Sequence, residues 1–246
     1  MAKINCILYS LIGILIFIFI SCNKGDIVTV PNNVTNEILH YNGMVISFNA
    51  DLHIPNWVAW ELTKEELNRK IKGQKKCHTD NAVRGCAVDA DYIFSGYSRG
   101  HMVPKGDMRW SEEAYRDVMY FTNIAPQNQS FNNGAWRNLE ELCRKWVKNE
   151  QSIIIICGPI ISDISEYIGD NRVAVPKRFF KVIYSLDNAH PKGLGFLFNN
   201  DEHKVKLEDC VVTIDSVEAV TEYDFLQKNN TANSIESKCD IRLWKK

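Results

Sequence analysis

The sequence predicts an α+β domain behind an N-terminal export signal. Three observations support this prediction: short segments rich in β-branched and aromatic residues, one long segment with amphipathic helical spacing, and no regular alternation of the two kinds. The chain has 246 residues, of which 45% are hydrophobic and 24% are charged. This length and composition are typical of a soluble domain that buries a substantial core.

Residues 1–22 have the features of an export signal. Lys3 precedes an uncharged apolar run over residues 4–20, and Ser21 and Cys22 follow. The position of Cys22 is typical of a bacterial lipoprotein, in which lipid attaches to that sulfur. An uncleaved anchor helix is the alternative, because seventeen apolar residues lie near the lower limit for spanning a bilayer. We expect a lipid anchor at Cys22 in a bacterial cell envelope, and both interpretations place the remaining chain outside the cytoplasm.

The chain after the signal divides into a short polar segment and one continuous domain. Residues 23–40 are polar and contain proline and several asparagines, so we expect a tether there. Residues 41–246 are expected to form the domain, since they contain no repeat and no low-complexity block. The first strand signals within the domain fall at residues 44–49 and 56–62.

A short helix is expected to begin at Ser111. The serine hydroxyl can accept hydrogen bonds from the first free amides, and the two glutamates that follow suit a helical first turn. This helix is expected to end near residue 119. A short strand over residues 120–124 and a loop rich in Asn and Gln over residues 125–133 are expected to follow.

The longest predicted helix covers residues 134–150. Its apolar stripe recurs at steps of three and four residues, at Trp136, Leu139, Cys143 and Trp146. The isoleucine-rich residues 152–157 predict a buried strand that ends at a Gly-Pro pair. Further strands are expected at residues 179–185 and 193–198.

Charge is balanced over the whole chain but not along it. The formal net charge of −1 gives no global basic field of the kind that attracts nucleic acid. Residues 64–84 contain seven Lys or Arg against three acids, and residues 172–181 contain four Lys or Arg. For residues 64–84, scattered charge of this kind is usually solvated surface, and the alternative is a rim that faces phosphates.

Six cysteines remain after the signal, an even number that suits an oxidising compartment and permits fifteen pairings. The pairings of nearest neighbours are Cys77–Cys86, Cys143–Cys157 and Cys210–Cys239. Cys157 can instead be a buried free thiol, because it ends the isoleucine run. A zinc site at Cys77, His78 and Cys86 is a less favoured alternative, since the spacing fits no common zinc pattern.

Residues 97–144 contain every group that hydrolysis of a phosphodiester requires: a base for the water, cations for the phosphate, and ligands for a metal. The groups stand in three pieces, Tyr97-Ser98-Arg99-Gly100-His101-Met102, Asn123-Ile124-Ala125-Pro126-Gln127, and residues 132–144. Asn132 follows His101 by thirty-one residues, and Trp136, Leu139 and Glu140 stand four, seven and eight residues beyond Asn132.

These pieces and their spacing resemble the DNA/RNA non-specific endonuclease family, whose members carry a ββα-metal site. The resemblance is clear over residues 90–160 and weaker over residues 40–246. It implies a central, mostly antiparallel sheet flanked by helices. It also implies an exported or membrane-anchored endonuclease that hydrolyses DNA and RNA with Mg²⁺, or alternatively Mn²⁺, and leaves 5′-phosphate ends. Nucleic acid and the membrane are the expected partners, and no protein partner can be inferred.

The resemblance assigns a role to each residue of the three pieces. His101 is the general base, because imidazole titrates near neutral pH. Asn132 holds the metal through its amide oxygen, and Glu140 orients the waters around the metal. A surface ion pair between Glu140 and Arg144 is compatible with that role, because the two residues share a helix face.

Three further residues and Arg99 complete the expected site. Arg99 is expected to stabilise the charge on phosphorus through its planar donors, with a structural salt bridge as its alternative role. Arg144 is a second candidate for the same task. Asn123 and Gln127 are expected to shape the site by hydrogen bonds.

One departure from the family pattern leaves two other interpretations open. The family's usual Asp before the Arg is Ser98 here, which can accept a hydrogen bond but brings no charge. The chain can therefore be a lipoprotein that binds nucleic acid through a weakened or inactive site. A structural module without a nucleic-acid role is the third interpretation, and it predicts that His101, Asn132 and Glu140 do not converge.

Overall fold

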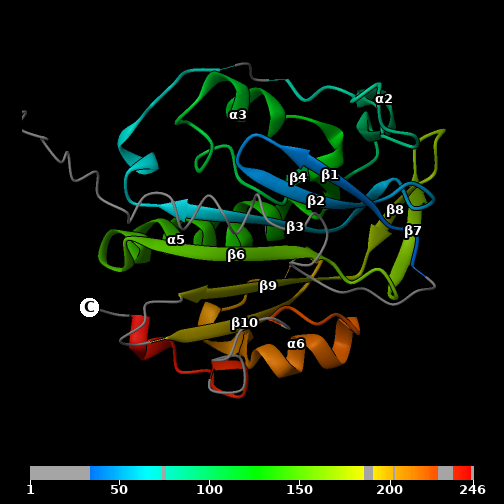
Figure 1. The fold of residues 1–246 in the computed structure, drawn as a ribbon. Helices are drawn as coiled ribbons and strands as arrows, with labels where there is room; N and C mark the ends of the chain where they lie inside the picture. The colour runs from blue at the N-terminus through cyan, green and yellow to red at the C-terminus, as the bar shows by residue number, and fades with distance from the viewer. Residues whose placement is uncertain (1–33, 74–75, 186–190, 202, 227–234, 245–246) are drawn as a thin grey trace, which may run out of the picture.

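The computed structural model of the chain describes residues 34–73, 76–185, 191–201, 203–226 and 235–244. Its main sheet has seven strands in the order β1-β2-β3-β6-β9-β10-β11, and each neighbouring pair is antiparallel (Figure 1). The strands are β1 (Glu37–Tyr41), β2 (Met44–Asn49), β3 (Ile54–Thr63), β6 (Ser152–Pro159), β9 (Arg178–Ser185), β10 (Lys192–Asn199) and β11 (Val211–Val212).

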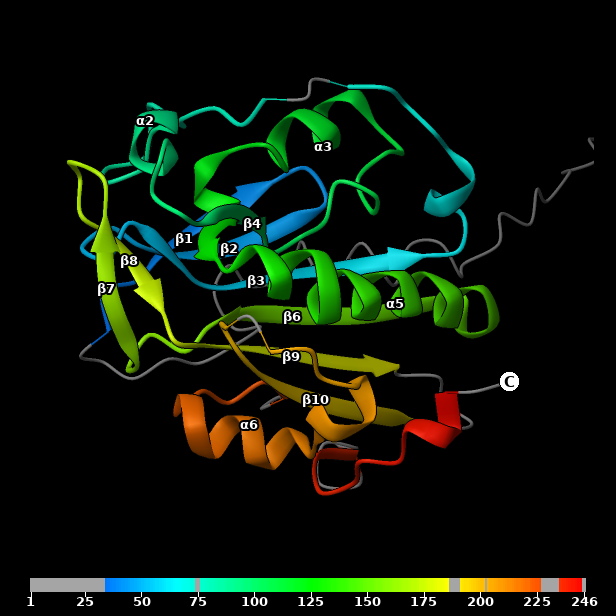
Figure 2. The same cartoon turned by 180° about the vertical axis from the view of Figure 1, so that it is seen from behind.

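Two small antiparallel pairs stand beside the main sheet. The ribbon of β4 (Ser98–His101) and β5 (Ile124–Gln127) lies above one face of the sheet, next to the helix that carries the site. The hairpin of β7 (Ile164–Ile168) and β8 (Val173–Pro176) stands at one end of the molecule, and its tip reaches α2 (Asp89–Tyr92) in both views (Figures 1 and 2). No strand is predicted from the sequence in this segment.

Helices cover both faces of the main sheet. The helix α5 (Arg137–Glu150) packs on β3 and β6 from one side, and α6 (Ile214–Thr221) packs on β9 and β10 from the other (Figure 2). The remaining helical segments are α3 (Glu112–Asp117), α4 (Gln129–Phe131), the π-helical segment η3 (Asn132–Trp136), and the 3-10 turns η1 (Glu66–Asn68), η2 (Phe121–Asn123), η4 (Leu207–Cys210) and η5 (Ile241–Trp244).

The central strands are apolar throughout because both of their faces are covered. In β6, Ile153, Ile155 and Cys157 join the core under α5, whereas Ile156 joins the smaller core under α6. Side chains alternate between faces along a strand, so two buried faces require a continuous apolar run. The run of isoleucines is therefore a central strand, as the sequence predicts, and it fixes α5 on one side of the sheet.

The predicted elements are largely confirmed, except over residues 120–136 and at the end of the tether. The strands β2, β3, β6, β9 and β10 all match predicted segments, and Ser111 caps α3 by accepting a hydrogen bond from Ala114 N at 3.1 Å. Phe121–Asn123 instead form the 3-10 turn η2, in which Asn123 N donates to Tyr120 O at 3.0 Å. The predicted loop over residues 125–133 contains most of β5 and all of α4. The tether predicted over residues 23–40 ends too late, because β1 already pairs with β2 from Glu37 onward.

The predicted disulfides are absent. All six cysteines of the domain are free thiols, and several have other partners: the Cys157 thiol donates to Met102 O at 3.3 Å, and Asp80 N donates to the Cys86 sulfur at 3.3 Å. Cys157 is thus the buried thiol that its place in β6 suggested.

The predicted export signal lies outside the described residues, as does most of the predicted tether. Within the described ranges, no helix has the length and apolar character needed to cross a bilayer.

Candidate active site

The β4–β5 ribbon holds His101 at the end of its first strand. His101 pairs with Ile124 across the ribbon, and its backbone carbonyl accepts a hydrogen bond from Trp136 Nε1 at 3.1 Å. Trp136 is fully buried at the entry to α5, so this bond connects the ribbon to the helix. Two segments thirty-five residues apart are thereby fixed in one arrangement.

Residues from the first and third predicted pieces line one cavity of about 500 Å³. His101, Asn132 and Glu140 all contribute to its wall. The complete lining is Lys76, Cys77, Asp89, Arg99, His101, Pro104, Lys105, Asn132, Asn133, Arg137 and Glu140. Four of these residues are cationic against two carboxylates, so the cavity is electropositive although the chain is nearly neutral. This convergence removes the interpretation of a structural module.

His101 is held as a neutral imidazole. Burial lowers the pKa of His101 to about 3, and the nearby Lys105 ammonium acts in the same direction. Its Nε2 atom lies 3.8 Å from the sulfur of Cys77, which also faces the cavity. A neutral imidazole retains a free lone pair, which is the form that can accept a proton.

Asn132 presents its side chain at a break in helical structure. It begins η3, in which Gly134 departs from helical geometry with φ −101° and ψ −109°, before the regular helix α5. Its backbone N–H donates to Asn128 O at 2.9 Å, whereas its side-chain amide has no hydrogen-bond partner among the described residues. An amide oxygen that faces a polar cavity without a partner suits a hard cation.

Glu140 faces the same cavity from the first turn of α5. Burial raises the pKa of Glu140 to about 7, and Lys181 is the largest influence that opposes this shift. Across the described chain, no ion pair or hydrogen bond to the Glu140 carboxylate is found, so the predicted pair with Arg144 is absent. Together, Asn132 and Glu140 supply the neutral and anionic oxygens that Mg²⁺ accepts, directly or through water.

Lys181 is the buried cation behind this wall. It is 1% exposed, and its ammonium lies 3.9 Å from the centre of the Trp136 ring. From the sequence, Lys181 is one of four cations in residues 172–181, and nothing in that stretch predicts its burial. Its position in the central strand β9 puts it inside the sheet–helix layer, where it is a positive charge close to Glu140.

Arg99 forms a structural salt bridge and also lines the cavity. It lines the cavity, and its Nε donates to Asp89 Oδ1 at 2.8 Å while a second nitrogen donates to Asp89 O at 3.1 Å. The guanidinium also lies 5.5 Å from the centre of the Tyr92 ring. The salt bridge therefore orients Arg99 at the wall of the cavity and does not remove it from the site.

Arg144, the second candidate for a phosphate contact, is not among the residues that line the cavity. Its guanidinium donates to Asp107 Oδ1 at 2.8 Å, and Asp107 is fully buried. The other Asp107 oxygen accepts from Trp60 Nε1 at 3.2 Å. Arg144 thus fixes α5 against β3 and the loop that follows His101.

The three predicted shaping residues differ in what they contact. Asn123 is fully buried, and its amide bonds to both backbone atoms of Val103, at 3.0 Å each, just beyond His101. Gln127 makes no side-chain hydrogen bond to the described residues, which corrects its predicted bonding role. Its amide instead packs on Gly100, where a Cβ would lie 2.3 Å from Gln127 Oε1. Ser98 pairs with Gln127 in the ribbon and does not line the cavity.

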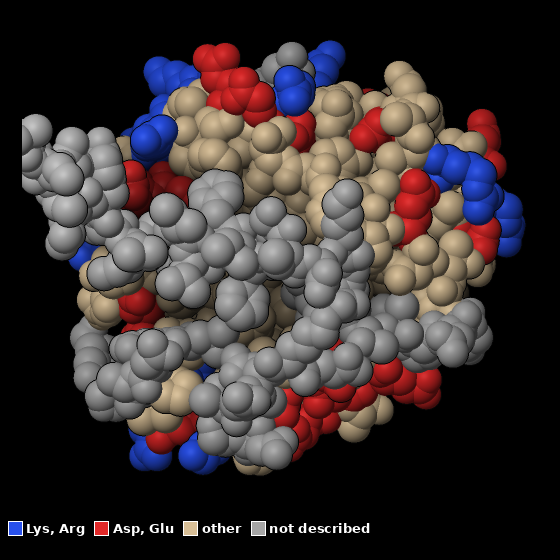
Figure 3. Space-filling view, viewed as in Figure 1, with Lys and Arg blue, Asp and Glu red and all other residues tan. Residues whose placement is uncertain are grey.

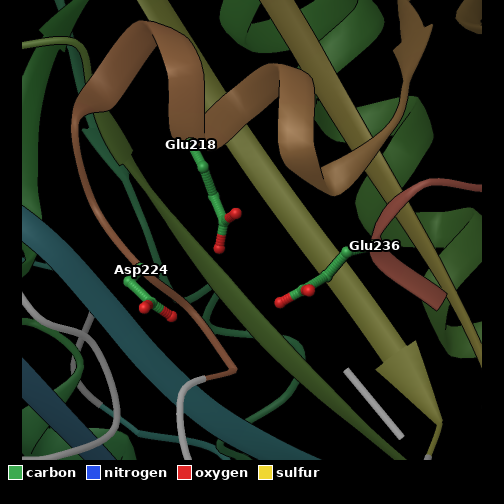
Figure 4. A group of neighbouring side chains, drawn as sticks. All are labelled: Glu218, Asp224 and Glu236. Atoms are coloured by element: carbon green, nitrogen blue, oxygen red, sulfur yellow. The ribbon is translucent and has the colours of Figure 1, made fainter. Parts of the chain in front are cut away.

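An acidic group stands apart from the cavity. Glu218 of α6, Asp224 and Glu236 bring carboxylate oxygens within 4.8 Å of one another, the one such grouping of acids, His or Cys among the described residues (Figure 4). Acidic side chains gather along the edge of the molecule where α6 lies (Figure 3). Burial raises the pKa of Glu218 to about 7 and also raises the pKa of Glu236.

Several residues of the cavity wall were not predicted from the sequence. Asp89, Lys105 and Cys77 lie outside the matched motif pieces, and no local spacing connects them to His101. Lys76 is the exception, because it belongs to the basic stretch for which a phosphate-facing rim was one interpretation. Only the fold brings the other three residues to the wall.

The fold and the site together define a nuclease of the ββα-metal class. An antiparallel ribbon presents His101, and the segment that follows carries Asn132 and, on α5, Glu140 to the same cavity. A model of the DNA/RNA non-specific endonuclease family matches residues 23–232, and the chain belongs to that family.

Relatives of known name agree with this assignment. The chain is 29% identical to mouse mitochondrial nuclease EXOG over 85% of this chain and 62% of the relative. It is 34% identical to bovine mitochondrial endonuclease G over 66% of this chain and 60% of the relative. It is 30% identical to a nuclease of Nostoc sp. over 85% of this chain and 82% of the relative. The chain therefore spans about three-fifths of the two mitochondrial relatives.

A solved structure extends the similarity to three dimensions. The EndoG/EndoGI complex, described for the mechanism of EndoG inhibition, contains a chain that matches with a TM-score of 0.73 at 26% identity. The match covers 79% of this chain and 87% of that chain.

Proposed function

We propose that this chain is a metal-dependent endonuclease that hydrolyses phosphodiester bonds in DNA and RNA and leaves 5′-phosphate ends. The observation that carries the proposal is the convergence of His101, Asn132 and Glu140 on one electropositive cavity. Membership of the non-specific endonuclease family supports the same activity. Contacts to phosphates carry no base information, so little sequence preference is expected.

In the proposed reaction, the neutral His101 accepts a proton from the attacking water. An anionic phosphate in the cavity opposes the effect of Lys105 on the imidazole, so substrate binding strengthens His101 as a base. Arg99, held by Asp89, donates to the phosphate oxygens. Asn132 and Glu140 would hold Mg²⁺ or Mn²⁺, which when bound supplies charge stabilisation for the phosphate and the leaving oxygen.

The alternative of a binding protein with an inactive site rested on Ser98 alone. Asp89 supplies a carboxylate to Arg99 from α2, so the charge missing at position 98 has a substitute in the chain. This contact favours a working site over a decayed one.

Digestion assays test the activity. Supercoiled plasmid, linear DNA and RNA are incubated with the purified protein in Mg²⁺, in Mn²⁺ and with chelator. We expect cleavage that the chelator abolishes and fragments whose 5′ ends can be labelled only after phosphatase treatment. The His101→Ala variant should be slower by about two orders of magnitude. Intact substrates at every Mg²⁺ and Mn²⁺ concentration would contradict the proposal.

We propose in addition that the chain is exported and lipid-anchored at Cys22. The support is the sequence pattern of residues 1–22. Metabolic labelling with an alkyne fatty acid tests the anchor. Incorporation should be lost in Cys22→Ala and retained in Cys6→Ala, and equal labelling of both variants would refute the assigned anchor.

A further inference from the structure

Phe94 is unusual in two independent ways. Its side chain is 102% exposed, the highest value among the large hydrophobic side chains described, and its backbone has φ +57°. A single exposed apolar residue is ordinary on a protein surface. A bulky aromatic residue in the left-handed region is uncommon and strained, because its Cβ crowds the following carbonyl. Folding therefore gains nothing from Phe94, although the turn holds it firmly.

The turn that carries Phe94 is fixed by hydrogen bonds on both sides. Ile93 N donates to Ala90 O at 3.2 Å, and Ser95 N donates to Tyr92 O at 3.3 Å. The Ser95 hydroxyl donates to Tyr92 O at 3.0 Å and accepts from Tyr97 N at 3.2 Å. The aromatic ring therefore projects from a defined support.

Both ends of this turn lead to the cavity. The turn leaves α2, whose Asp89 lines the cavity, and enters β4, whose Arg99 also lines it. Phe94 is five residues from Arg99, so the two Cα atoms are at most about 18 Å apart. Tyr97 at the end of the turn donates to Glu166 Oε1 at 2.6 Å, which braces the turn on the β7–β8 hairpin.

We propose that Phe94 is a base-stacking contact for the nucleic-acid substrate. When a phosphate occupies the cavity, a nucleobase within a few nucleotides of it stacks on the exposed ring. Aromatic rings bind unpaired bases in this way without sequence preference. The turn residues 93–97 contain no acid that would repel the backbone. The inference rests on the proposed nuclease function and adds to it a preference for substrates with unpaired or easily unstacked bases.

The test compares Phe94→Gly with Phe94→Trp. Glycine accepts φ +57° without strain, so Phe94→Gly should fold normally and melt at the same temperature or up to a few degrees higher. Binding is measured in chelator, where no cleavage occurs, to single-stranded oligonucleotides with 2-aminopurine at successive positions. We expect wild type and Phe94→Trp to quench the fluorophore at one position. Phe94→Gly should lose that quenching and bind about fivefold or more weakly.

Cleavage assays in Mg²⁺ separate this inference from the proposed function. In Phe94→Gly, KM for the oligonucleotide should rise, whereas turnover of a single-nucleoside p-nitrophenyl phosphodiester should not change. If the wild type cleaves neither substrate, the proposed function fails, and the chelator binding assay still decides the role of Phe94. Equal quenching and affinity in wild type and Phe94→Gly would overturn the inference. If Phe94→Gly keeps its affinity for the oligonucleotide but no longer binds phosphatidylglycerol vesicles, Phe94 is a membrane contact and the inference is overturned. If the affinity is kept and the oligomeric state changes, Phe94 is a contact between two copies of the chain, which also overturns the inference.

Discussion

At the scale of single residues, Asp89 has a defined task that the motif does not reveal. It binds Arg99 through two atoms, in a chain where the residue before Arg99 is uncharged. The pair is partly exposed, so its energy is modest.

Asp89→Asn should therefore lower kcat/KM for DNA by about two- to fivefold, because Arg99 loses the charge that orients it. Initial rates on plasmid DNA measure the effect. Asp240→Asn is the matched control, since Asp240 forms a similar exposed pair with Arg242 and does not line the cavity. Equal losses in both variants would show that the effect is not local to Arg99.

The burial of Glu140 at the cavity lowers the free energy of unfolding when its carboxyl group is ionised. Burial raises the pKa of Glu140 in the folded protein to about 7, so folding favours the neutral carboxylic acid over the carboxylate. Stability contributed by that proton is fully present below the unfolded pKa of about 4.5 and is lost as the pH rises through about 7.

Glu140→Gln should remove this penalty. We expect the metal-free variant to be more stable than wild type by about 1–3 kcal/mol at pH 8, with the gain shrinking as the pH falls towards 4.5. Cleavage by the variant should nevertheless fall sharply, because the amide brings no charge to the metal. Denaturant unfolding at several pH values measures the stability. A variant that is less stable than wild type at pH 8 would contradict the assigned cause.

At the scale of elements, the connection of α5 to β3 depends on one buried ion pair. Asp107 bonds to Arg144 of α5 and to Trp60 of β3. Asp107→Ala would leave the Arg144 guanidinium half-buried without its partner, which typically costs about 3–5 kcal/mol.

We expect Asp107→Ala to unfold at a correspondingly lower urea concentration and to lose activity through the displaced helix. The double variant Asp107→Leu/Arg144→Met should recover most of the stability, because it removes both charges together. Urea unfolding of the two variants decides the point. A double variant no more stable than Asp107→Ala would mean that packing, and not the unpaired charge, controls this contact.

The elements also show where sequence reasoning succeeds. The stripe of Trp136, Leu139, Cys143 and Trp146 predicts α5 because helical periodicity is a local property. The partner of Arg144 was not predictable, because Asp107 lies thirty-seven residues away and no spacing rule connects them. The same holds for Lys181, whose burial depends on which strand is central in the sheet.

At the scale of the whole molecule, positive and negative charges nearly balance, so attraction for phosphate comes from the local charge of the cavity. The chain carries a net charge of −1, and four cations converge at the cavity. Each cation that contacts a phosphate adds to the salt dependence of binding through counterion release.

Lys105→Ala should therefore weaken DNA binding and reduce the slope of log affinity against log salt by about 1. Binding isotherms at several salt concentrations in chelator measure the slope. Lys206→Ala is the control, because Lys206 is exposed and does not line the cavity. An unchanged slope in Lys105→Ala would exclude this lysine from the phosphate path.

The most direct test of the account is the Mg²⁺ dependence of cleavage in wild type, His101→Ala and Asn132→Ala. We expect His101→Ala to lower the limiting rate by about a hundredfold or more at saturating Mg²⁺ and to leave the half-saturating Mg²⁺ concentration nearly unchanged. We expect Asn132→Ala to raise the half-saturating Mg²⁺ concentration. Wild-type rates and wild-type Mg²⁺ dependence in both variants would contradict a shared catalytic centre for the imidazole and the amide.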